Sequence, residues 1–158
     1  MAIILSIETS TAICSVAIHN SGSLVSLAEI KESGVHAEQL MQLVVDAVEK
    51  ATMVLSDLDG IAVSEGPGSY TGLRIGISTA KGLAFGLNLP LISINTLQAL
   101  ASTLAVEEDA LIIPVLDARR MEIYREVFDS NFNSVSKLDA EILEEGIFQN
   151  FLEKGRVY

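Results

Sequence analysis

The sequence predicts an α/β fold with a mixed sheet and helices on its faces. Short apolar segments separated by turn residues follow one another near the N-terminus, and helical periodicity then alternates with short apolar runs. In addition, 49% of the 158 residues are hydrophobic and only 20% are charged. Such a chain can bury a sizeable core, so we expect about one folded domain rather than intrinsic disorder.

Three strands in a meander are expected at the start of the chain. Their apolar runs are residues 3–7, 14–19 and 24–30. The stretches between these runs are rich in Thr, Ser, Asn and Gly, which is typical of turns. A helix is expected over residues 35–51, where apolar side chains recur at helical spacing. Leu43 and Val45 widen its apolar stripe beyond what one packing surface needs, so this helix is a candidate for contact with a second body.

The middle of the chain alternates strands and helices. A strand, a helix, a strand and a helix are expected over residues 61–64, 70–87, 91–94 and 95–105. The turn Glu65-Gly-Pro-Gly-Ser69 separates the first strand from the first helix, because it cannot continue a strand. Three strands followed by this alternation predict a mixed sheet covered by helices.

A domain boundary is expected near Glu107-Glu108-Asp109, where the small apolar residues stop. It separates a first lobe, residues 1–106, from a partial second lobe, residues 107–158. Within the second lobe, residues 111–116 and 121–128 predict two consecutive strands. We expect the first lobe to be complete and the second to be truncated, because the chain ends where a second sheet would still need strands.

Composition and charge exclude several classes of function. Lys and Arg number 10 against 21 Asp and Glu, and the resulting net charge of −11 disfavours binding of nucleic acid by this chain alone. One cysteine and two histidines argue against a disulfide framework and against a cysteine- or histidine-rich metal site. The N-terminus has no basic leader and no apolar run is long enough to span a bilayer, so a cytoplasmic protein is expected.

Two motifs are candidates for binding a phosphate. Glu8-Thr9-Ser10-Thr11 follows the first strand and either binds a phosphate or hydrated cation or forms a hydroxyl-rich turn between two strands. Gly66-Pro67-Gly68-Ser69-Tyr70-Thr71-Gly72 follows a strand and opens a helix. Its amides either face an anion at the positive end of the helix dipole or form a tight corner. It is not a Walker A loop, because no Lys follows a glycine at the required place.

The helix over residues 70–87 is rich in glycine. It contains Gly72, Gly76, Gly82 and Gly86. Each glycine costs about 1 kcal/mol relative to alanine in a helix interior, so a compensating contact is expected. Small residues on a helix face let another backbone approach closely. That backbone belongs either to the same chain or to a helix of another chain, and the wide apolar stripe of residues 35–51 favours the second alternative.

Groups suited to catalysis are few. His36 could act as a base, but a polar role at the helix start is favoured, because the sequence places no second titratable group beside it. Asp117-Ala-Arg119-Arg120 favours a salt bridge within a turn over anion binding. Cys14 lies in an apolar strand, which indicates a thiol buried in the core.

Several runs together resemble one known family. The matching runs are Ile4-Leu-Ser-Ile-Glu8-Thr-Ser10, Val35-His36-Ala-Glu38, Leu58-Asp59-Gly-Ile-Ala-Val63, Gly66-Pro-Gly-Ser-Tyr-Thr-Gly-Leu-Arg-Ile-Gly76, Thr79-Ala-Lys81-Gly-Leu-Ala84 and Asp117-Ala-Arg-Arg120. The sequence resembles the TsaB family, also called YeaZ, whose members are accessory proteins in bacterial synthesis of the tRNA modification threonylcarbamoyladenosine.

The resemblance implies the actin-like ATPase fold, in which each of two lobes contains a ribonuclease-H-like sheet. It also implies a non-catalytic paralogue of TsaD, the transferase subunit that holds a metal through a His-x-x-x-His pair. Thr96 and Leu100 stand at the positions of those histidines, so no metal and no transfer chemistry are expected. Glu8 stands where the first phosphate loop of the fold has an aspartate. Its extra methylene displaces the carboxylate, which argues against ATP hydrolysis.

The leading hypothesis is therefore a scaffold that pairs with a TsaD-type paralogue and a TsaE-type ATPase and reaches tRNA only through the complex. Alone, the chain is expected to form a homodimer through the helices at 35–51 and 69–87. The expected interface residues are His36, Leu40, Met41, Val44, Gly72, Arg74, Ile75, Gly76 and Thr79. A vestigial nucleotide site without a bound cofactor is expected at Glu8, Thr9, Ser10, Gly66, Gly68 and Ser69. The alternative is a small ATPase or phosphotransferase that uses the motifs at 8–11 and 66–69.

Overall fold

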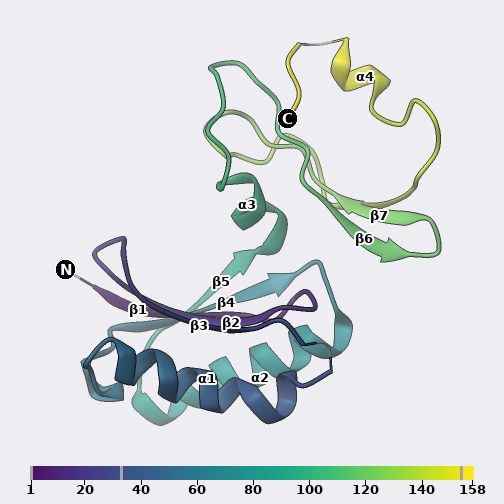
Figure 1. Cartoon of the computed structure of the whole chain (residues 1–158). Coiled ribbons are helices and arrows are strands. Elements are labelled where there is room, and N and C mark those ends of the chain that lie inside the picture. Colours follow the sequence, from purple (N-terminus) through teal and green to yellow (C-terminus); the bar gives the residue numbers. More distant parts are fainter. Residues whose placement is uncertain (1, 33, 154) are drawn as a thin grey trace. The chain divides into compact units, whose positions relative to one another are not determined.

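The computed structural model describes residues 2–32, 34–153 and 155–158. Contacts within the chain divide it into two compact units, residues 1–94 and 95–158 (Figure 1). The helix α3, Thr96–Ala101, belongs to the second unit because Leu97 and Ala101 pack in one core cluster with Ile112 and Phe128. The composition change near residue 107 lies further along the chain, and a lobe boundary at that point stays a prediction.

The first unit is built on a five-stranded mixed sheet with the strand order β3-β2-β1-β4-β5. The strands are β1 Ile3–Glu8, β2 Cys14–Asn20, β3 Ser23–Ile30, β4 Gly60–Gly66 and β5 Leu91–Asn95. Strand β2 pairs antiparallel with both β1 and β3, whereas β4 runs parallel to β1. The predicted meander of three strands and the predicted mixed sheet are therefore confirmed.

Two long helices cover one face of this sheet. They are α1 His36–Lys50 and α2 Tyr70–Leu87, which lie side by side in Figure 1. Because side chains alternate between the two faces of a strand, Leu5 and Ile7 of β1 point to the same face, where they join Leu40 and Val44 of α1 in the core. The short 3₁₀ turn η1, Leu55–Asp57, leads from α1 into β4.

Local signals at both ends explain the bounds of α2. Ser69 is the N-cap, and its hydroxyl accepts a hydrogen bond from the amide of Gly72 (3.2 Å). Asn88 ends the helix in the left-handed conformation, with φ of 54°. The helix predicted over residues 70–87 is therefore confirmed with the same bounds.

The second unit contains a three-stranded antiparallel sheet in the order β6-β7-β8. Its remaining elements after α3 are β6 Val115–Arg119, β7 Glu122–Arg125, β8 Asp139–Ile142 and α4 Gln149–Leu152. The strand predicted at 121–128 is confirmed over Glu122–Arg125, whereas the strand predicted at 111–116 is shifted to Val115–Arg119. The ladder starts only after Pro114, which has no N–H to donate, while Ile112 and Phe128 form an isolated bridge.

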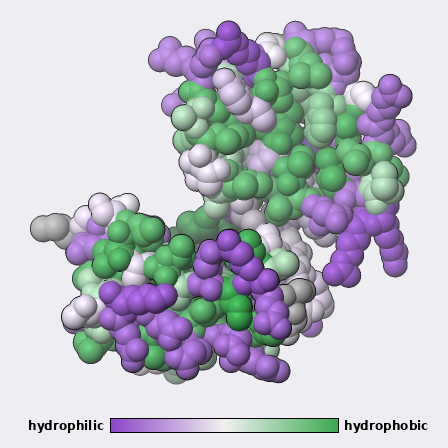
Figure 2. Space-filling view, in the orientation of Figure 1, coloured by the Kyte–Doolittle hydropathy of each residue, from purple (hydrophilic) through white to green (hydrophobic). Residues whose placement is uncertain are grey.

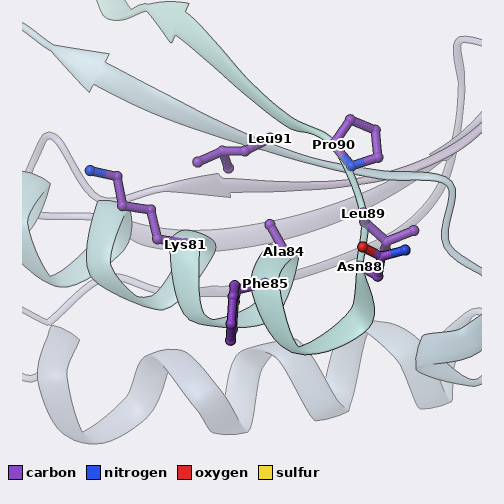
Figure 3. A pocket seen from close by; sticks show the side chains of 7 residues that line it. All are labelled: Lys81, Ala84, Phe85, Asn88, Leu89, Pro90 and Leu91. Atoms are coloured by element: carbon purple, nitrogen blue, oxygen red, sulfur yellow. The ribbon is translucent and has the colours of Figure 1, made fainter.

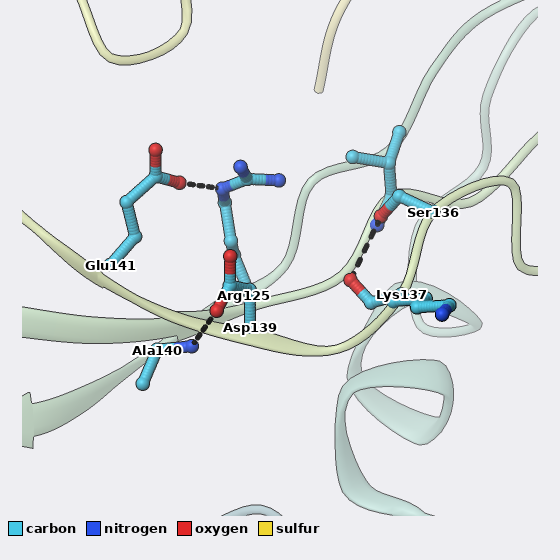
Figure 4. A network of polar contacts seen from close by, with 7 residues as sticks. Arg125, Ser136, Lys137, Asp139, Ala140 and Glu141 are labelled. Atoms are coloured by element: carbon cyan, nitrogen blue, oxygen red, sulfur yellow. Dashed lines mark hydrogen bonds and ion pairs between the residues drawn. The ribbon is translucent and has the colours of Figure 1, made fainter.

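Polar contacts connect β7 to the segments around it (Figure 4). Arg125 of β7 forms an ion pair with Glu141 of β8, and its guanidinium carbon lies 5.4 Å from the ring centroid of Phe151. Asp139 accepts a hydrogen bond from the amide of Ala140 (2.9 Å) at the start of β8. These contacts stabilise the register in which Arg125 lies opposite Asp139.

The surface of the second unit carries many exposed apolar side chains. In Figure 2, apolar residues gather over the centre of its visible face and hydrophilic residues lie around the rim. Met121 and Ile142 are among the exposed residues, at 67% and 58%. In the part of the chain that the structure describes, no helix combines the length and the apolar character needed to cross a membrane.

Candidate functional site

The two motifs that the sequence singles out lie together at the start of α2. The amide of Ser69, in the glycine-rich loop, donates a hydrogen bond to the carbonyl of Ser10, in the turn between β1 and β2 (2.6 Å). Gly68 permits this approach, because a Cβ at Gly68 would lie within 3.0 Å of the backbone of Ser10. The turn that contains Glu8, Thr9 and Ser10 and the loop at 66–69 thus form one structure.

The carboxylate of Glu8 is held by its own chain. One oxygen accepts a hydrogen bond from the amide of Ser10 (2.6 Å), and the other accepts a short hydrogen bond from the hydroxyl of Ser64 on β4. The amide of Ser69 is bonded to Ser10, and the amide of Gly72 to the hydroxyl of Ser69. The Glu8 carboxylate and these two amides are therefore engaged within the chain, whereas the buried hydroxyls of Thr9 and Ser10 have no hydrogen-bond partner among the described residues.

The glycines in the first half of α2 pack against the turn after β1. A Cβ at Gly72 would lie within 3.0 Å of the carbonyl oxygen of Thr9, and a Cβ at Gly76 within 3.0 Å of the Thr9 hydroxyl. Both glycines and Thr9 are buried. The prediction that these two glycines accommodate another chain is wrong, because Thr9 of the same chain occupies the space. Gly82 and Gly86 differ, since nothing lies within 4 Å of a Cβ at either position.

His36 connects α1 to the same turn. Its Nε2 lies 3.0 Å from the carbonyl of Thr11, and because a carbonyl can only accept, Nε2 donates. The side chain is 6% exposed, so it supports the turn from inside. This hydrogen bond agrees with the polar role expected at the helix start, but it leaves His36 buried rather than on an outer surface.

The expected interface residues divide into buried and exposed groups. Leu40 and Val44 are each 1% exposed and belong to the core, so their assignment to an outer surface is wrong. The hydrophobic effect places this half of the stripe against the sheet. Met41 is 47% exposed, and Val45, one turn further along, is 43% exposed. Of the two residues that widen the stripe in the sequence, Val45 is therefore exposed, whereas Leu43 is 7% exposed and belongs to the core.

On α2, the outer residues are mostly polar. Arg74 is exposed, and its guanidinium carbon lies 4.0 Å from the centroid of the Tyr70 ring, a cation–π geometry. Ile75 and Thr79 are half-buried. The exposed apolar residue on this helix that the sequence reasoning missed is Phe85, at 91% exposure.

Position 96 lies in the second unit, next to a residue that contacts a buried carboxylate. Thr96 is 6% exposed and its hydroxyl has no hydrogen-bond partner among the described residues, whereas Leu100 is 41% exposed. Neighbouring Asn95 caps α3 through its Oδ1 and donates from Nδ2 to the buried Glu126 (2.7 Å). Asn95 therefore contributes structural hydrogen bonds at the position where the resemblance places the transferase site.

Two further sequence expectations have clear outcomes. Asp117 accepts a hydrogen bond from the backbone amide of Arg119 (2.7 Å), and within the described residues neither Arg119 nor Arg120 forms an ion pair. The predicted turn salt bridge is therefore wrong.

Cys14 is fully buried, as predicted. Burial raises the pKa of its thiol, and the negative charge of Glu8 raises it further.

The order of strands and helices and the paired loops define a protein of the actin-like ATPase fold class. At the level of fold, the ethanolamine utilization protein EutJ from Carboxydothermus hydrogenoformans matches 96% of this chain and 56% of its own, with a TM-score of 0.55 and 16% identity. A crystal structure from Pseudomonas aeruginosa, of a protein with similarity to peptidase YEAZ, is much more similar. The match between the two structures covers 92% of this chain and 68% of the Pseudomonas aeruginosa protein, with a TM-score of 0.81 and 31% identity.

Sequence relatives identify the family. The chain is 35% identical to the tRNA threonylcarbamoyladenosine biosynthesis protein TsaB of Escherichia coli, over 84% of this chain and 57% of the relative. It is 30% identical to the protein of the same name from Buchnera aphidicola subsp. Acyrthosiphon pisum, over 96% of this chain and 69% of the relative. Residues 31–145 match the family model TsaD, tRNA N6-adenosine threonylcarbamoyltransferase. The chain belongs to the TsaB (YeaZ) family, and it spans 57% and 69% of the length of these two relatives.

Proposed function

We propose that the chain is a cytoplasmic, non-catalytic accessory subunit in the synthesis of N6-threonylcarbamoyladenosine at position 37 of tRNA. Its family membership supports the pathway, because relatives at 30% and 35% identity carry the name of a biosynthesis protein for this modification. The observation that carries the non-catalytic role is the engagement of Glu8 with Ser10 and Ser64. A scaffold needs no free carboxylate at this point, whereas an ATPase does.

The alternative, a small ATPase or phosphotransferase, has two observations in its favour, one of which is that the buried hydroxyls of Thr9 and Ser10 have no hydrogen-bond partner among the described residues. The turn at 8–11 and the loop at 66–69 lie together, as a nucleotide site of this fold requires. Their amides and the Glu8 carboxylate are, however, bonded to one another. To bind a nucleotide, the chain would have to break these hydrogen bonds, and each buried group left without a partner costs about 1–3 kcal/mol.

The proposed partners are a TsaD-type paralogue and a TsaE-type ATPase. We assign the pairing with the paralogue to the outer ridge of α1, which comprises Ala37, Met41 and Val45, together with Arg74 of α2. The ridge is apolar and exposed, with Met41 at 47% and Val45 at 43%. A helical face of this kind is buried when two helices of each subunit pack together. In the absence of the paralogue, the same ridge would support a homodimer.

Co-purification with the TsaD-type protein of the same organism tests the pairing. The double variant Met41→Glu/Val45→Glu is expected to lose the partner and to reduce tRNA modification in a reconstituted assay, because two charges would be buried at the interface. Val54→Glu is the matched control, since Val54 is 58% exposed and lies before η1, outside the α1 ridge. Unchanged pairing of the double variant would refute the assigned surface. Full modification without the chain would refute the function itself.

A further inference from the structure

Strand β5 forms an unusual edge of the sheet in the first unit. Among the described residues it is the last strand in the order β3-β2-β1-β4-β5. Leu91, Ile92 and Ile94 are 38%, 40% and 36% exposed, and Ser93 between them is exposed as well. Proteins usually protect an exposed edge with charged residues, proline or a bulge. No such residue lies within positions 91–94, so the edge is open to pairing with another strand.

The other edge of the same sheet is protected. Lys50 of α1 donates a hydrogen bond from Nζ to the carbonyl of Leu27 on β3 (3.1 Å). A lysine near an edge strand is one of the devices that oppose pairing with a further strand. Strand β3 also exposes Leu24, Val25 and Leu27, so the two edges differ in the charged residues at β3, Lys50 and Glu29, and not in the exposure of apolar side chains.

The backbone of β5 presents its free groups at defined positions. The carbonyl of Pro90 accepts a hydrogen bond from the amide of Ile61 on β4 (3.0 Å), so the backbone groups of Pro90 face β4. Successive residues of a strand direct their N–H and C=O groups to opposite sides in turn. The groups of Leu91 and Ser93 therefore point away from β4, where an added strand would lie.

A cavity of about 530 Å³ adjoins this edge on the helix side (Figure 3). Lys81, Ala84 and Phe85 of α2 line it together with Leu89 and Leu91. Since Leu91 faces the cavity, alternate side chains of a strand added beside β5 would enter it from the same face of the sheet. Phe85 is 91% exposed, and a cavity of this volume has room for such side chains.

The positive charge of Lys81 beside the cavity favours one kind of partner. Lys81 forms no ion pair within the described residues, although the chain has 21 acidic against 10 basic residues. A cation beside apolar side chains is complementary to a segment that alternates apolar and acidic residues on one face. Such pairing at a sheet edge is a recurring mode of peptide recognition, with backbone hydrogen bonds for affinity and side-chain pockets for specificity.

We propose that the β5 edge and the adjoining cavity bind an extended segment of a partner protein, which adds to the sheet as a further strand. An apolar side chain of that segment packs against Phe85 and Leu91, and an acidic side chain faces Lys81. This binding site lies outside the α1 ridge and goes beyond the proposed role in tRNA modification.

Fluorescence anisotropy with a labelled peptide, Thr-Ile-Thr-Asp-Thr-Val-Thr, tests the proposal. Ile, Asp and Val lie on one face of this peptide when it is extended. Ser93→Pro removes an outward amide and is expected to weaken binding at least about tenfold, whereas Ser93→Thr changes it by no more than about twofold. Lys81→Glu is expected to reverse the preference, so that the peptide with Lys in place of Asp binds better. Met41→Glu/Val45→Glu should bind like the parent.

Three results would overturn the proposal. The first is no binding at protein concentrations up to about 1 mM, which is weaker than specific recognition requires. The second is equal binding of the Asp and Lys peptides by the parent. The third is a dimer of the parent in sedimentation that Ser93→Pro abolishes, because the edge would then pair with a second copy. Lys81→Glu changes only an exposed side chain, so it keeps the test decisive if Ser93→Pro does not fold.

Discussion

Thr9 is the residue on which the candidate site depends. It is fully buried, its carbonyl and hydroxyl pack against Gly72 and Gly76, and its hydroxyl has no hydrogen-bond partner among the described residues. The approach of this turn to α2 explains why a long helix tolerates glycine in its first half. The cost of glycine in a helix, about 1 kcal/mol, is offset here by packing that no larger residue allows.

Alanine substitutions in α2 should therefore have opposite effects in its two halves. Gly72→Ala and Gly76→Ala are expected to lower the free energy of unfolding by about 1–3 kcal/mol, because the new methyl group overlaps Thr9. Gly82→Ala is the matched control. It is expected to raise the free energy of unfolding by about 0.5–1 kcal/mol, because the space around Gly82 is open. Urea unfolding measures all three. Equal effects at Gly76 and Gly82 would contradict the packing argument.

Cys14 should be chemically inert in the folded protein. Burial, and next the charge of Glu8, raise the pKa of its thiol above the ordinary 9.0, so the reactive thiolate is scarce at neutral pH. Iodoacetamide at pH 8 is expected to modify Cys14 slowly in the native state and rapidly in urea. Because the folded-state pKa is raised, this group contributes stability below pH 9.0 that is lost as the pH rises. Rapid modification without denaturant would argue against a core thiol.

Glu8 is expected to determine whether the paired loops bind nucleotide. Because its two oxygens accept hydrogen bonds from Ser10 and Ser64, Mg-ATP at millimolar concentration is expected to leave the melting temperature unchanged. Glu8→Ala should lower stability by about 1–3 kcal/mol, because it leaves those two donors without their partner. Calorimetry that finds micromolar affinity for Mg-ATP, with turnover abolished by Glu8→Ala, would establish the ATPase instead.

At the scale of elements, the sequence predicts best where one apolar pattern runs without interruption. The three N-terminal strands and the long helices follow such patterns, because periodicity reports which face is buried. Periodicity does not report what covers each face, so it does not distinguish Leu40 and Val44, which pack on the sheet, from residues of an outer surface. The expected helix at 95–105 forms only over Thr96–Ala101, because Ser102 and Thr103 return hydrogen bonds to the carbonyls of Ala99 and Leu100.

Contacts between distant segments could not be predicted from one sequence. The approach of Thr9 to Gly76 joins a turn and a helix that are far apart in the chain. Glycine spacing alone is compatible with packing inside the chain or between chains, and only the arrangement in space decides. The pairing of Asn95 with Glu126 is a similar case, since neither residue lies in a distinctive motif.

The loop that follows β7 is organised around a single carboxylate. Asp129 accepts hydrogen bonds from the Asn133 side chain (3.1 Å) and from the amides of Asn133 (2.8 Å) and Asn131 (2.9 Å). The side-chain bond from Asn133 and then the backbone bonds hold the pKa of Asp129 below its ordinary 3.8.

The order of this loop should therefore depend on pH. With a lowered pKa in the folded state, the Asp129 contribution is present above pH 3.8 and is lost as the pH falls through the folded-state value. An NMR titration of the carboxyl group should give a pKa below 3.8 in the parent and a value closer to 3.8 in Asn133→Ala. Asn131→Ala keeps the amide at position 131 and serves as the control. Identical titrations of Asn133→Ala and the parent would contradict the proposed cause.

At the scale of the whole molecule, charge constrains the proposed role of the chain in tRNA modification. A net charge of −11 repels the phosphate backbone at long range, and the exposed arginines Arg74, Arg119, Arg120 and Arg156 are too few to reverse it. The chain alone is therefore expected to show no specific binding of tRNA in filter assays at about 150 mM salt, whereas the complex with a TsaD-type partner retains tRNA. Met41→Glu/Val45→Glu should lose the retention that depends on this chain, while Val54→Glu should keep it. Tight binding by the chain alone, weakening steeply between about 50 and 200 mM salt, would mean that it contacts the phosphates directly and that the complex is not needed for recognition.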